Sequence, residues 1–289
     1  MTVNQLYKAS INILKPSSSS PETDARIIIS HCLGLDATAF VMAFDNQVSV
    51  EQELLIKDLI KQRSNGKPVA YITGERGFYE CIFKVNENVL IPRADTEILV
   101  DSAIIDIQNS FKDYKPIHIL DLCCGSGCIG ISVAKILAKS FKEVDLTLSD
   151  ISTKALEVCS QNVKSLITED NIKTTIINSN LFENINEKYD VILSNPPYIA
   201  TSVIAKLEVQ VQNEPHLALD GGEDGLDLIK QIIANAPRHL NANGLLQFEI
   251  GYDQGISAQN LLSQSNYYDI TVIKDFGGCD RVVKGRIKD

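Results

Sequence analysis

Hydrophobic residues in the C-terminal two thirds of the chain form short apolar runs that alternate with segments of helical periodicity. The apolar runs predict strands at residues 117–121, 145–149, 174–178, 190–194, 244–250, 270–275 and 281–285. Helices are predicted between them, at residues 128–139, 153–167, 225–239 and 255–264. This alternation is typical of a parallel sheet with helices on both faces.

The last two predicted strands depart from that pattern, because only residues 276–280 separate them. A parallel crossover needs a dozen or more residues, so these two strands should pair antiparallel. The predicted fold class is therefore α/β, with a Rossmann-like, mostly parallel sheet that ends in an antiparallel C-terminal hairpin.

The first 73 residues show helical patterns only. Helices are predicted at residues 4–15, from Pro21 to Gly34, at 37–44 and at 49–63. Ser20 stands at an N-cap position before Pro21, and residues 49–52 have the spacing of a capping box. A small helical domain, residues 1–73, is predicted to recognise the substrate.

Residues 74–94 are predicted to form a β-hairpin linker, with strands at 78–85 and 89–91 around Asn86, Glu87 and Asn88. A helix through residue 110 should follow, capped by Asp95 or Thr96. The main domain is then predicted to span residues 95–289.

The composition fits a soluble globular protein, with 44% hydrophobic and 22% charged residues. A net charge of 27 − 37 = −10 argues against duplex nucleic acid as the main partner. The seven cysteines are odd in number and contain no C-x-x-C pair, so neither a disulfide framework nor a metal site is predicted. The N-terminus lacks a signal-peptide pattern and no run of about 18 apolar residues occurs. We expect a cytoplasmic, reduced monomer without membrane or direct nucleic-acid partners.

A glycine-rich turn follows the first predicted strand of the main domain. Gly125, Gly127 and Gly130 match G-x-G-x-x-G, and Asp150 ends the next strand, 23 residues after Gly127. Such glycines let the backbone approach a ligand, and the acidic residue can accept both hydroxyls of a ribose. The pattern indicates that the protein binds a nucleoside cofactor, either NAD or S-adenosylmethionine. Asp121 at the strand end favours S-adenosylmethionine, because its amino-acid part is cationic.

A rigid polar loop follows the strand at residues 190–194, and it reads Ser194, Asn195, Pro196, Pro197 and Tyr198. The prolines stiffen the chain and remove backbone donors, which leaves an amide side chain, carbonyl groups and an aromatic ring. This rim suits a flat, weakly nucleophilic NH2 group. The segment from Asn195 to Asp224 is unusually long for a loop, and loops of that length are commonly functional.

Nearly the whole chain resembles the HemK family of peptide chain release factor glutamine methyltransferases. The resemblance rests on the helical N-terminal region, residues 77–79, 90–97, 121–127, 180–182, 195–198, 213–215 and 220–225, together with Asp150. Two positions depart from the family pattern: Ala94 stands where a second proline is usual, and Asn180 where Asp is common.

The resemblance implies a class I S-adenosylmethionine-dependent fold, and a substrate glutamine in the Gly-Gly-Gln loop of release factors. It implies that Asp150 holds the ribose and that Asn195 binds the substrate amide. Pro196 and Tyr198 would be catalytic together with Asn195. All three, with Pro197, would form the substrate site. The cofactor contacts implied are Asp121, Cys123, Cys124, Gly125, Ser126, Gly127, Asp150, Leu181, Phe182 and Asn195.

Several alternatives stay open on the sequence alone. The same loop chemistry serves a glutamine methyltransferase of a ribosomal protein, or an enzyme that methylates the exocyclic amine of adenine. A non-catalytic nucleotide-binding module and an NAD dehydrogenase also share the glycine-rich turn. Cofactor titration and methyl-transfer assays discriminate among them.

Overall fold

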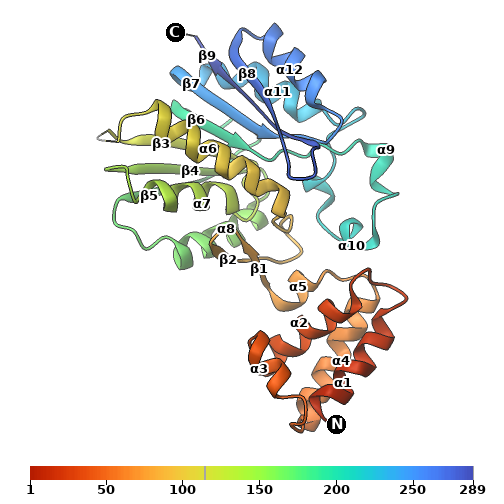
Figure 1. Cartoon of the computed structure of the whole chain (residues 1–289). Coiled ribbons are helices and arrows are strands. Elements are labelled where there is room, and N and C mark those ends of the chain that lie inside the picture. The colour runs from red at the N-terminus through yellow and green to blue at the C-terminus, as the bar shows by residue number, and fades with distance from the viewer. Residues whose placement is uncertain (114, 289) are drawn as a thin grey trace. The chain divides into compact units, whose positions relative to one another are not determined.

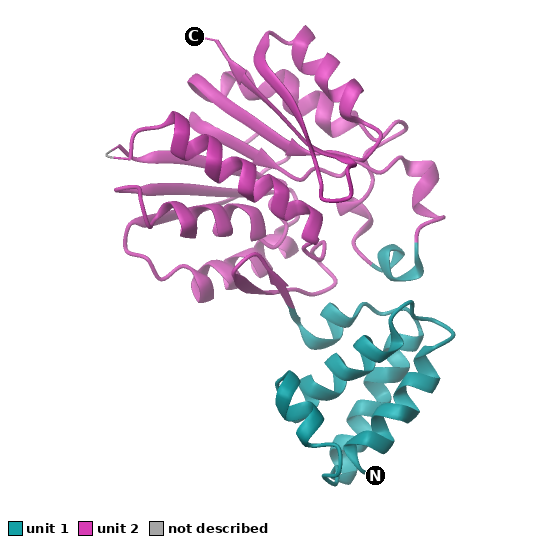
Figure 2. Ribbon diagram, viewed as in Figure 1, with its two compact units in different colours: residues 1–75, 208–213 teal, residues 76–207, 214–289 magenta. Residues whose placement is uncertain are grey.

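The computed structural model describes residues 1–113 and 115–288. Within them, the chain divides into two compact units (Figure 2). One contains Met1–Glu75 with Glu208–Asn213, and the other contains Arg76–Leu207 with Glu214–Asp289. A short segment from the second half of the sequence therefore belongs to the N-terminal unit.

The N-terminal unit is built from helices, and those of residues 1–75 contribute to a core of apolar side chains. They are α1 (Val3–Leu14), α2 (Pro21–Leu33), α3 (Ala37–Met42), α4 (Val50–Ser64), α5 (Val69–Thr73) and, from the later segment, α10 (Val209–Gln212). The capping box at Ser49 and the left-handed Gly34 that ends α2 are confirmed. The helix α5 was not predicted, because Pro68 in the sequence looked only like a stop signal.

A buried ion pair fixes the later segment to this unit. Arg63, at the end of α4, is 4% exposed and places Nε 2.7 Å from Asp24 Oδ2. The same guanidinium donates to Gln210 Oε1 at 3.2 Å, and Asn213 Nδ2 donates to the Gly66 carbonyl at 3.0 Å. The N-terminal unit thus completes its hydrogen bonds with residues that follow the β6 loop in sequence.

In the second unit, one sheet has the strand order β5-β4-β3-β6-β7-β9-β8 (Figure 1). Strands β3 to β7 pair in parallel, and β9 pairs antiparallel with both β7 and β8. The predicted mixed sheet with an antiparallel end is confirmed. The strands are β3 (Ile117–Leu122), β4 (Val144–Asp150), β5 (Ile172–Asn178), β6 (Tyr189–Ser194), β7 (Leu240–Glu249), β8 (Tyr267–Lys274) and β9 (Asp280–Ile287).

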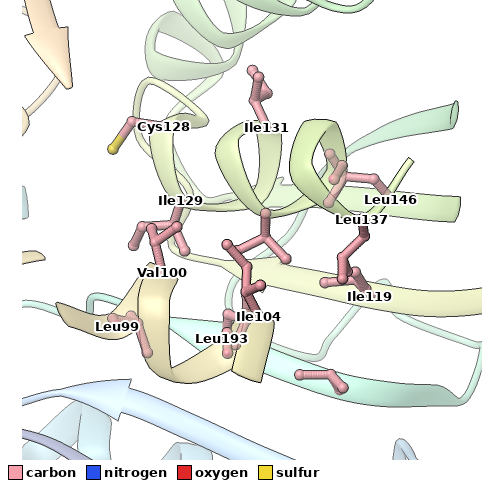
Figure 3. Close-up of a cluster of buried hydrophobic side chains, with 14 of the residues drawn as sticks. Leu99, Val100, Ile104, Ile119, Cys128, Ile129, Ile131, Leu137, Leu146 and Leu193 are labelled. Atoms are coloured by element: carbon pink, nitrogen blue, oxygen red, sulfur yellow. The ribbon is translucent and has the colours of Figure 1, made fainter. Parts of the chain in front are cut away.

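Alternate residues of the central strands point to opposite faces of the sheet, and each face has its own hydrophobic core. In β3, Ile119 belongs to the core that includes helices α6, α7 and α8, whereas Leu120 belongs to the core under α11 and α12. Figure 3 shows the first core, where Val100 and Ile104 of α6 lie close to Ile129 of α7. The helices are α6 (Glu97–Ser110), α7 (Cys128–Leu137), α8 (Thr153–Leu166), α11 (Asp227–Asn235) and α12 (Gly255–Gln264).

The predicted position of the β-hairpin is wrong. The hairpin pairs β1 (Glu75–Phe78) with β2 (Cys81–Lys84), and its turn lies at Tyr79 and Glu80. Tyr79 has a φ of 53°, a left-handed conformation that is uncommon for a bulky residue. The Asn86–Asn88 segment instead forms a loop in which the Asn86 side chain accepts from the Asn88 amide.

The predicted cap of α6 is also wrong. A 3-10 turn, Ala94–Thr96, precedes the helix, and among the described residues no amide of the first turn donates to the side chain of Thr96. Thr96 is instead buried, and its hydroxyl accepts from Asn195. The residue that looked like a helix signal therefore belongs to the neighbourhood of the β6 loop.

Candidate functional site

A cavity that is open to solvent lies at the carboxyl edge of the parallel strands. The strand order reverses between β3 and β6, and ligands of open α/β sheets bind at such a switch point. The loops after β3, β4, β5 and β6 all contribute to its lining. Lining residues named in the sequence analysis are Cys123, Cys124, Gly125, Ser126, Asp150, Leu181, Asn195 and Pro197.

The glycine-rich loop after β3 is held in an unusual backbone conformation. Cys123 has a φ of 59°, Gly125 of 53° and Gly127 of 80°. A side chain at Gly125 would meet no described atom within 4 Å, so the backbone there borders open space. A left-handed backbone conformation costs free energy in any residue other than glycine, and such residues are common at functional sites. Cys123 is a residue of this kind.

Asp150, at the end of β4, faces this loop across the cavity edge. Its Oδ2 accepts from the Gly125 amide at 2.9 Å, and its Oδ1 accepts from the Ser152 amide at 2.9 Å. Burial raises the pKa of Asp150, and the backbone amides partly offset that effect. Each carboxylate oxygen keeps a lone pair that can accept a hydroxyl group of a ribose.

A fully buried asparagine supports the glycine loop from behind. Asn162 of α8 donates to the Ser126 carbonyl at 2.9 Å and to the Lys84 carbonyl at 3.0 Å. Its Oδ1 accepts from the Lys84 amide at 2.8 Å. One side chain therefore joins the β1–β2 hairpin to the cavity wall.

Asp121 lies one layer below the cavity. It is fully buried, and its Oδ2 accepts from the Gly130 amide at 2.8 Å. Among the described residues, Oδ1 has no hydrogen-bond partner. Burial is the main cause that raises the pKa of Asp121 to about 7, so the carboxylate is poised between its two protonation states near neutrality.

The β6 loop is fixed to the sheet on both sides. Ser194 Oγ donates to the Leu122 carbonyl at 2.7 Å, which joins the ends of β6 and β3. Gln254 Nε2 donates to the Tyr198 carbonyl at 2.9 Å. A Cβ at Gly221 would lie 2.8 Å from the Pro197 carbonyl oxygen, so only glycine permits this close packing of the loop.

Asn195 and Tyr198 point in different directions from that loop. Asn195 lines the cavity, and its Nδ2 donates to Thr96 Oγ1 at 3.4 Å. The Tyr198 ring packs against the core under α11 and α12, and its hydroxyl donates to Glu249 Oε1 at 2.9 Å. Desolvation and the Glu249 charge raise the pKa of Tyr198, so this hydroxyl stays protonated.

Some residues of the predicted site lie behind the cavity surface rather than on it. Phe182 stacks on His239, with ring centroids 4.7 Å apart. Its neighbour Leu181 lines the cavity with a left-handed φ of 47°. Among the described residues, the predicted site members outside the lining are Asp121, Gly127, Pro196, Phe182 and Tyr198.

Residues outside the predicted set also line or support the cavity. Glu214 is 5% exposed; its Oε2 accepts from the Ile91 amide at 3.0 Å, and its Oε1 pairs with Arg93 at 2.5 Å. Arg93 and Thr96 line the cavity. The resemblance of residues 213–215 to the family pattern was the only sequence signal for Glu214, and it did not reveal the partner.

Comparison with known proteins identifies related domains and folds. A family model of the PrmC N-terminal domain matches residues 5–74, and one of the methyltransferase small domain matches residues 104–214. The solved methyltransferase of Pyrococcus furiosus has a TM-score of 0.50 at 14% identity, and covers 81% of this chain and 100% of its own. The hMettl16 catalytic domain has a TM-score of 0.55 at 14% identity, over 84% and 87%.

Two curated relatives cover nearly the full chain. The release factor glutamine methyltransferase of Agrobacterium fabrum is 36% identical over 93% of this chain and 91% of its own. That of Clostridium botulinum is 36% identical over 99% of both chains.

Within the described residues, no helix is both long enough and apolar enough to cross a membrane.

The fold and the cavity define a class I methyltransferase that depends on S-adenosylmethionine. The open backbone at Gly125 and the aspartate at the end of β4 fit a nucleoside of this kind. More particularly, the chain belongs to the release factor glutamine methyltransferase family.

Proposed function

We propose that the protein transfers the methyl group of S-adenosylmethionine to the side-chain amide nitrogen of the glutamine in the Gly-Gly-Gln motif of peptide chain release factors. The observation that carries this proposal is the presence of Asn195 and Asp150 on one cavity. An amide-binding side chain and a ribose-binding carboxylate thereby share one site. The relatives named above supply the identity of the protein substrate.

The cofactor contacts in this proposal follow from the cavity wall. Asp150 accepts the ribose hydroxyls, and Leu181, supported by Phe182, lies against the adenine. The loop Cys123–Gly127 borders the amino-acid part at the start of α7, where backbone N–H groups favour its carboxylate. Asp121, fully buried one layer below that loop, favours the cationic ammonium group through its charge when it is ionised.

The substrate contacts come from the β6 loop. A carboxamide nitrogen is a poor nucleophile because its lone pair is delocalised into the carbonyl group. Asn195 Oδ1 and the Pro196 carbonyl each accept one N–H of the glutamine amide, which fixes the direction of attack. Pro197 lies on the cavity wall beside them, and the packed Tyr198 ring keeps the loop rigid.

When bound, S-adenosylmethionine supplies a methyl group whose bond to the cationic sulfur breaks as its bond to the amide nitrogen forms. The nitrogen then loses one proton to water, so no strong base is needed before transfer. The protein contributes positioning and preorganised acceptors, which is a large part of the rate in many enzymes.

The partner in this proposal is a bacterial-type release factor in the cytoplasm, recognised by the helical N-terminal domain of residues 1–73. The enzyme acts as a monomer and makes no direct contact with nucleic acid, in keeping with the net charge of −10. Neither step of the proposal requires a metal ion.

Methyl transfer from labelled S-adenosylmethionine to a purified release factor tests the proposal. We expect label in the protein fraction with the wild-type substrate, and none when the motif glutamine is replaced by alanine. Label on a ribosomal protein or on RNA, with none on the release factor, would instead support one of the alternative transferases.

A further inference from the structure

A buried carboxylate lies behind the β6 loop and is not part of the cavity wall. Glu249, at the end of β7, is 1% exposed. Its Oε1 accepts the Tyr198 hydroxyl at 2.9 Å, whereas its Oε2 has no partner of hydrogen-bond geometry among the described residues. Burying a carboxylate is costly unless it is paired and hydrogen-bonded.

Thr96 lies between this carboxylate and Asn195. Thr96 is 1% exposed, and its hydroxyl favours the ionised form of Glu249. Its Oγ1 accepts from Asn195 Nδ2 at 3.4 Å. The two side chains that the β6 loop presents, Asn195 and Tyr198, are thus both connected to Glu249.

The direction of these hydrogen bonds follows from the chemistry of each group. An ionised carboxylate only accepts, whereas a hydroxyl has one proton to donate and two lone pairs. Ionised Glu249 attracts the Thr96 proton, although the pair does not reach hydrogen-bond geometry, and the Thr96 lone pairs remain for Asn195. Asn195 must then turn its NH2 group toward Thr96, which leaves its oxygen for the cavity.

The charges around Glu249 come from several elements. Arg281 of β9 favours its ionised form and lies 3.0 Å from Asp275 and 3.5 Å from Asp95. Burial acts against ionisation and is the larger effect, so the pKa of Glu249 lies above that of an ordinary glutamate, and Asp95 adds to this shift. Protonation of Glu249 therefore begins at a higher pH than that of an ordinary glutamate.

We infer that Glu249 is a positioning residue which, through Thr96, determines that the oxygen and not the nitrogen of the Asn195 amide faces the substrate NH2 group. If the Asn195 amide were turned by 180°, its NH2 group would face the NH2 group of the glutamine, and it could not accept the glutamine N–H. This inference rests on the proposed function, since it assigns the orientation of the same amide-binding side chain.

Kinetics with paired substitutions test this role. Glu249→Gln keeps the shape but can donate to Thr96, so we expect kcat to fall by about a hundredfold, the lower end of the range for loss of one preorganised polar contact. The Kd for S-adenosylmethionine should change by less than about twofold, because Glu249 does not line the cavity. Thr96→Val should reproduce the loss, and Thr96→Ser, which restores the hydroxyl, should recover most of kcat.

A matched control removes a partly buried charge that also contacts strands of the sheet. Asp106 of α6 contacts Gln247 of β7 and Lys284 of β9, and it is absent from the cavity lining. Asp106→Asn should leave kcat within about twofold of the wild-type value. At saturating cofactor, the acid limb of the kcat profile should be present in the wild type and in Asp106→Asn, and absent in Glu249→Gln.

A measurement without substrate separates this inference from the proposed function. In protein labelled with nitrogen-15 asparagine, the Asn195 NH2 signals can be assigned by their loss in Asn195→Ala. We expect one of these protons to exchange slowly with water in the wild type and at least about tenfold faster in Glu249→Gln and Thr96→Val. Unchanged exchange in both variants would overturn the inference, whether or not release factors prove to be the substrate. A wild-type enzyme that fails to methylate release factors, yet shows this pattern, would overturn only the proposed function.

Discussion

The Gly125 amide donates a hydrogen bond of 2.9 Å to Asp150 Oδ2, which joins the glycine-rich loop to the end of the neighbouring strand. This bond sets the position of the carboxylate before any ligand arrives. Because the second oxygen is held by the Ser152 amide, the whole carboxylate is preorganised. Two sequence features that are 25 residues apart are therefore held together at the edge of the cavity.

Replacing Asp150 with asparagine should weaken cofactor binding. The amide keeps the shape but loses the charge, and hydrogen bonds to a charged group contribute about 1.5–3 kcal/mol, or roughly ten- to a hundredfold in Kd. Calorimetric titration with S-adenosylmethionine measures the effect. Asp145→Asn, on the same strand but away from the cavity, should bind like the wild type. Equal affinities for the Asp150 variant and the wild type would remove Asp150 from the ribose site.

Cofactor affinity should also depend on pH through the same carboxylate. The pKa of Asp150 is raised by burial, so the ionised, ribose-binding form is present above that pKa and is lost as the pH falls through it. Affinity should therefore begin to decline at a higher pH than an ordinary aspartate, with its pKa of 3.8, would cause. Titrations over a pH series give the profile, and the Asp150→Asn variant should lack this acid-dependent loss.

The stability of the cofactor-free protein should reveal the state of Asp121. Its pKa rises from 3.8 in the unfolded chain to about 7 in the fold, so the native state binds the extra proton between these values. The free energy of unfolding then decreases as the pH rises from about 4 to about 7, by at most about 4 kcal/mol from this group. Denaturant unfolding at several pH values should show a smaller decrease in Asp121→Asn. Parallel pH dependences would contradict the assignment.

The glycine at position 130 is required for space rather than for backbone freedom. A Cβ there would lie 2.9 Å from both Asp121 and Leu146, whereas a Cβ at Gly278, where φ is +81°, would meet no described atom within 4 Å. Gly130→Ala should lower the free energy of unfolding by about 1–3 kcal/mol, the usual cost of overpacking. Gly278→Ala isolates the backbone cost, which is about 1 kcal/mol, and urea unfolding compares the two. A smaller loss at Gly130 than at Gly278 would contradict the packing argument.

The sheet could be predicted because each strand carries its own signal. Apolar runs such as residues 190–194 are buried on both faces, and only a short turn separates β8 from β9, so pairing direction followed from chain length. The hairpin gave no such signal. Three of the four residues of β1 are exposed, and its turn uses Tyr79 rather than a glycine or asparagine.

The residues of the site fall into the same two groups: some lie in local sequence motifs, and others come together only through contacts distant in sequence. The glycine turn, Asp150 and Asn195 lie in contiguous motifs, and their side of the sheet follows from strand direction. Thr96 and Glu249 meet Asn195 and Tyr198 across separations of 99 and 51 residues, and nothing local marks them as partners. Glu214 likewise reaches Arg93 over 121 residues. Contacts between residues so far apart in sequence leave no local pattern from which they could be predicted.

The site of modification on the substrate tests the central claim most directly. A release factor is incubated with the enzyme and S-adenosylmethionine, digested, and sequenced by fragmentation mass spectrometry, with Asn195→Ala as the matched enzyme control. We predict a single methyl group on the side chain of the Gly-Gly-Gln glutamine with the wild type, and none with Asn195→Ala although that variant still binds the cofactor. A methyl group on any other residue, or full methylation by Asn195→Ala, would contradict the account.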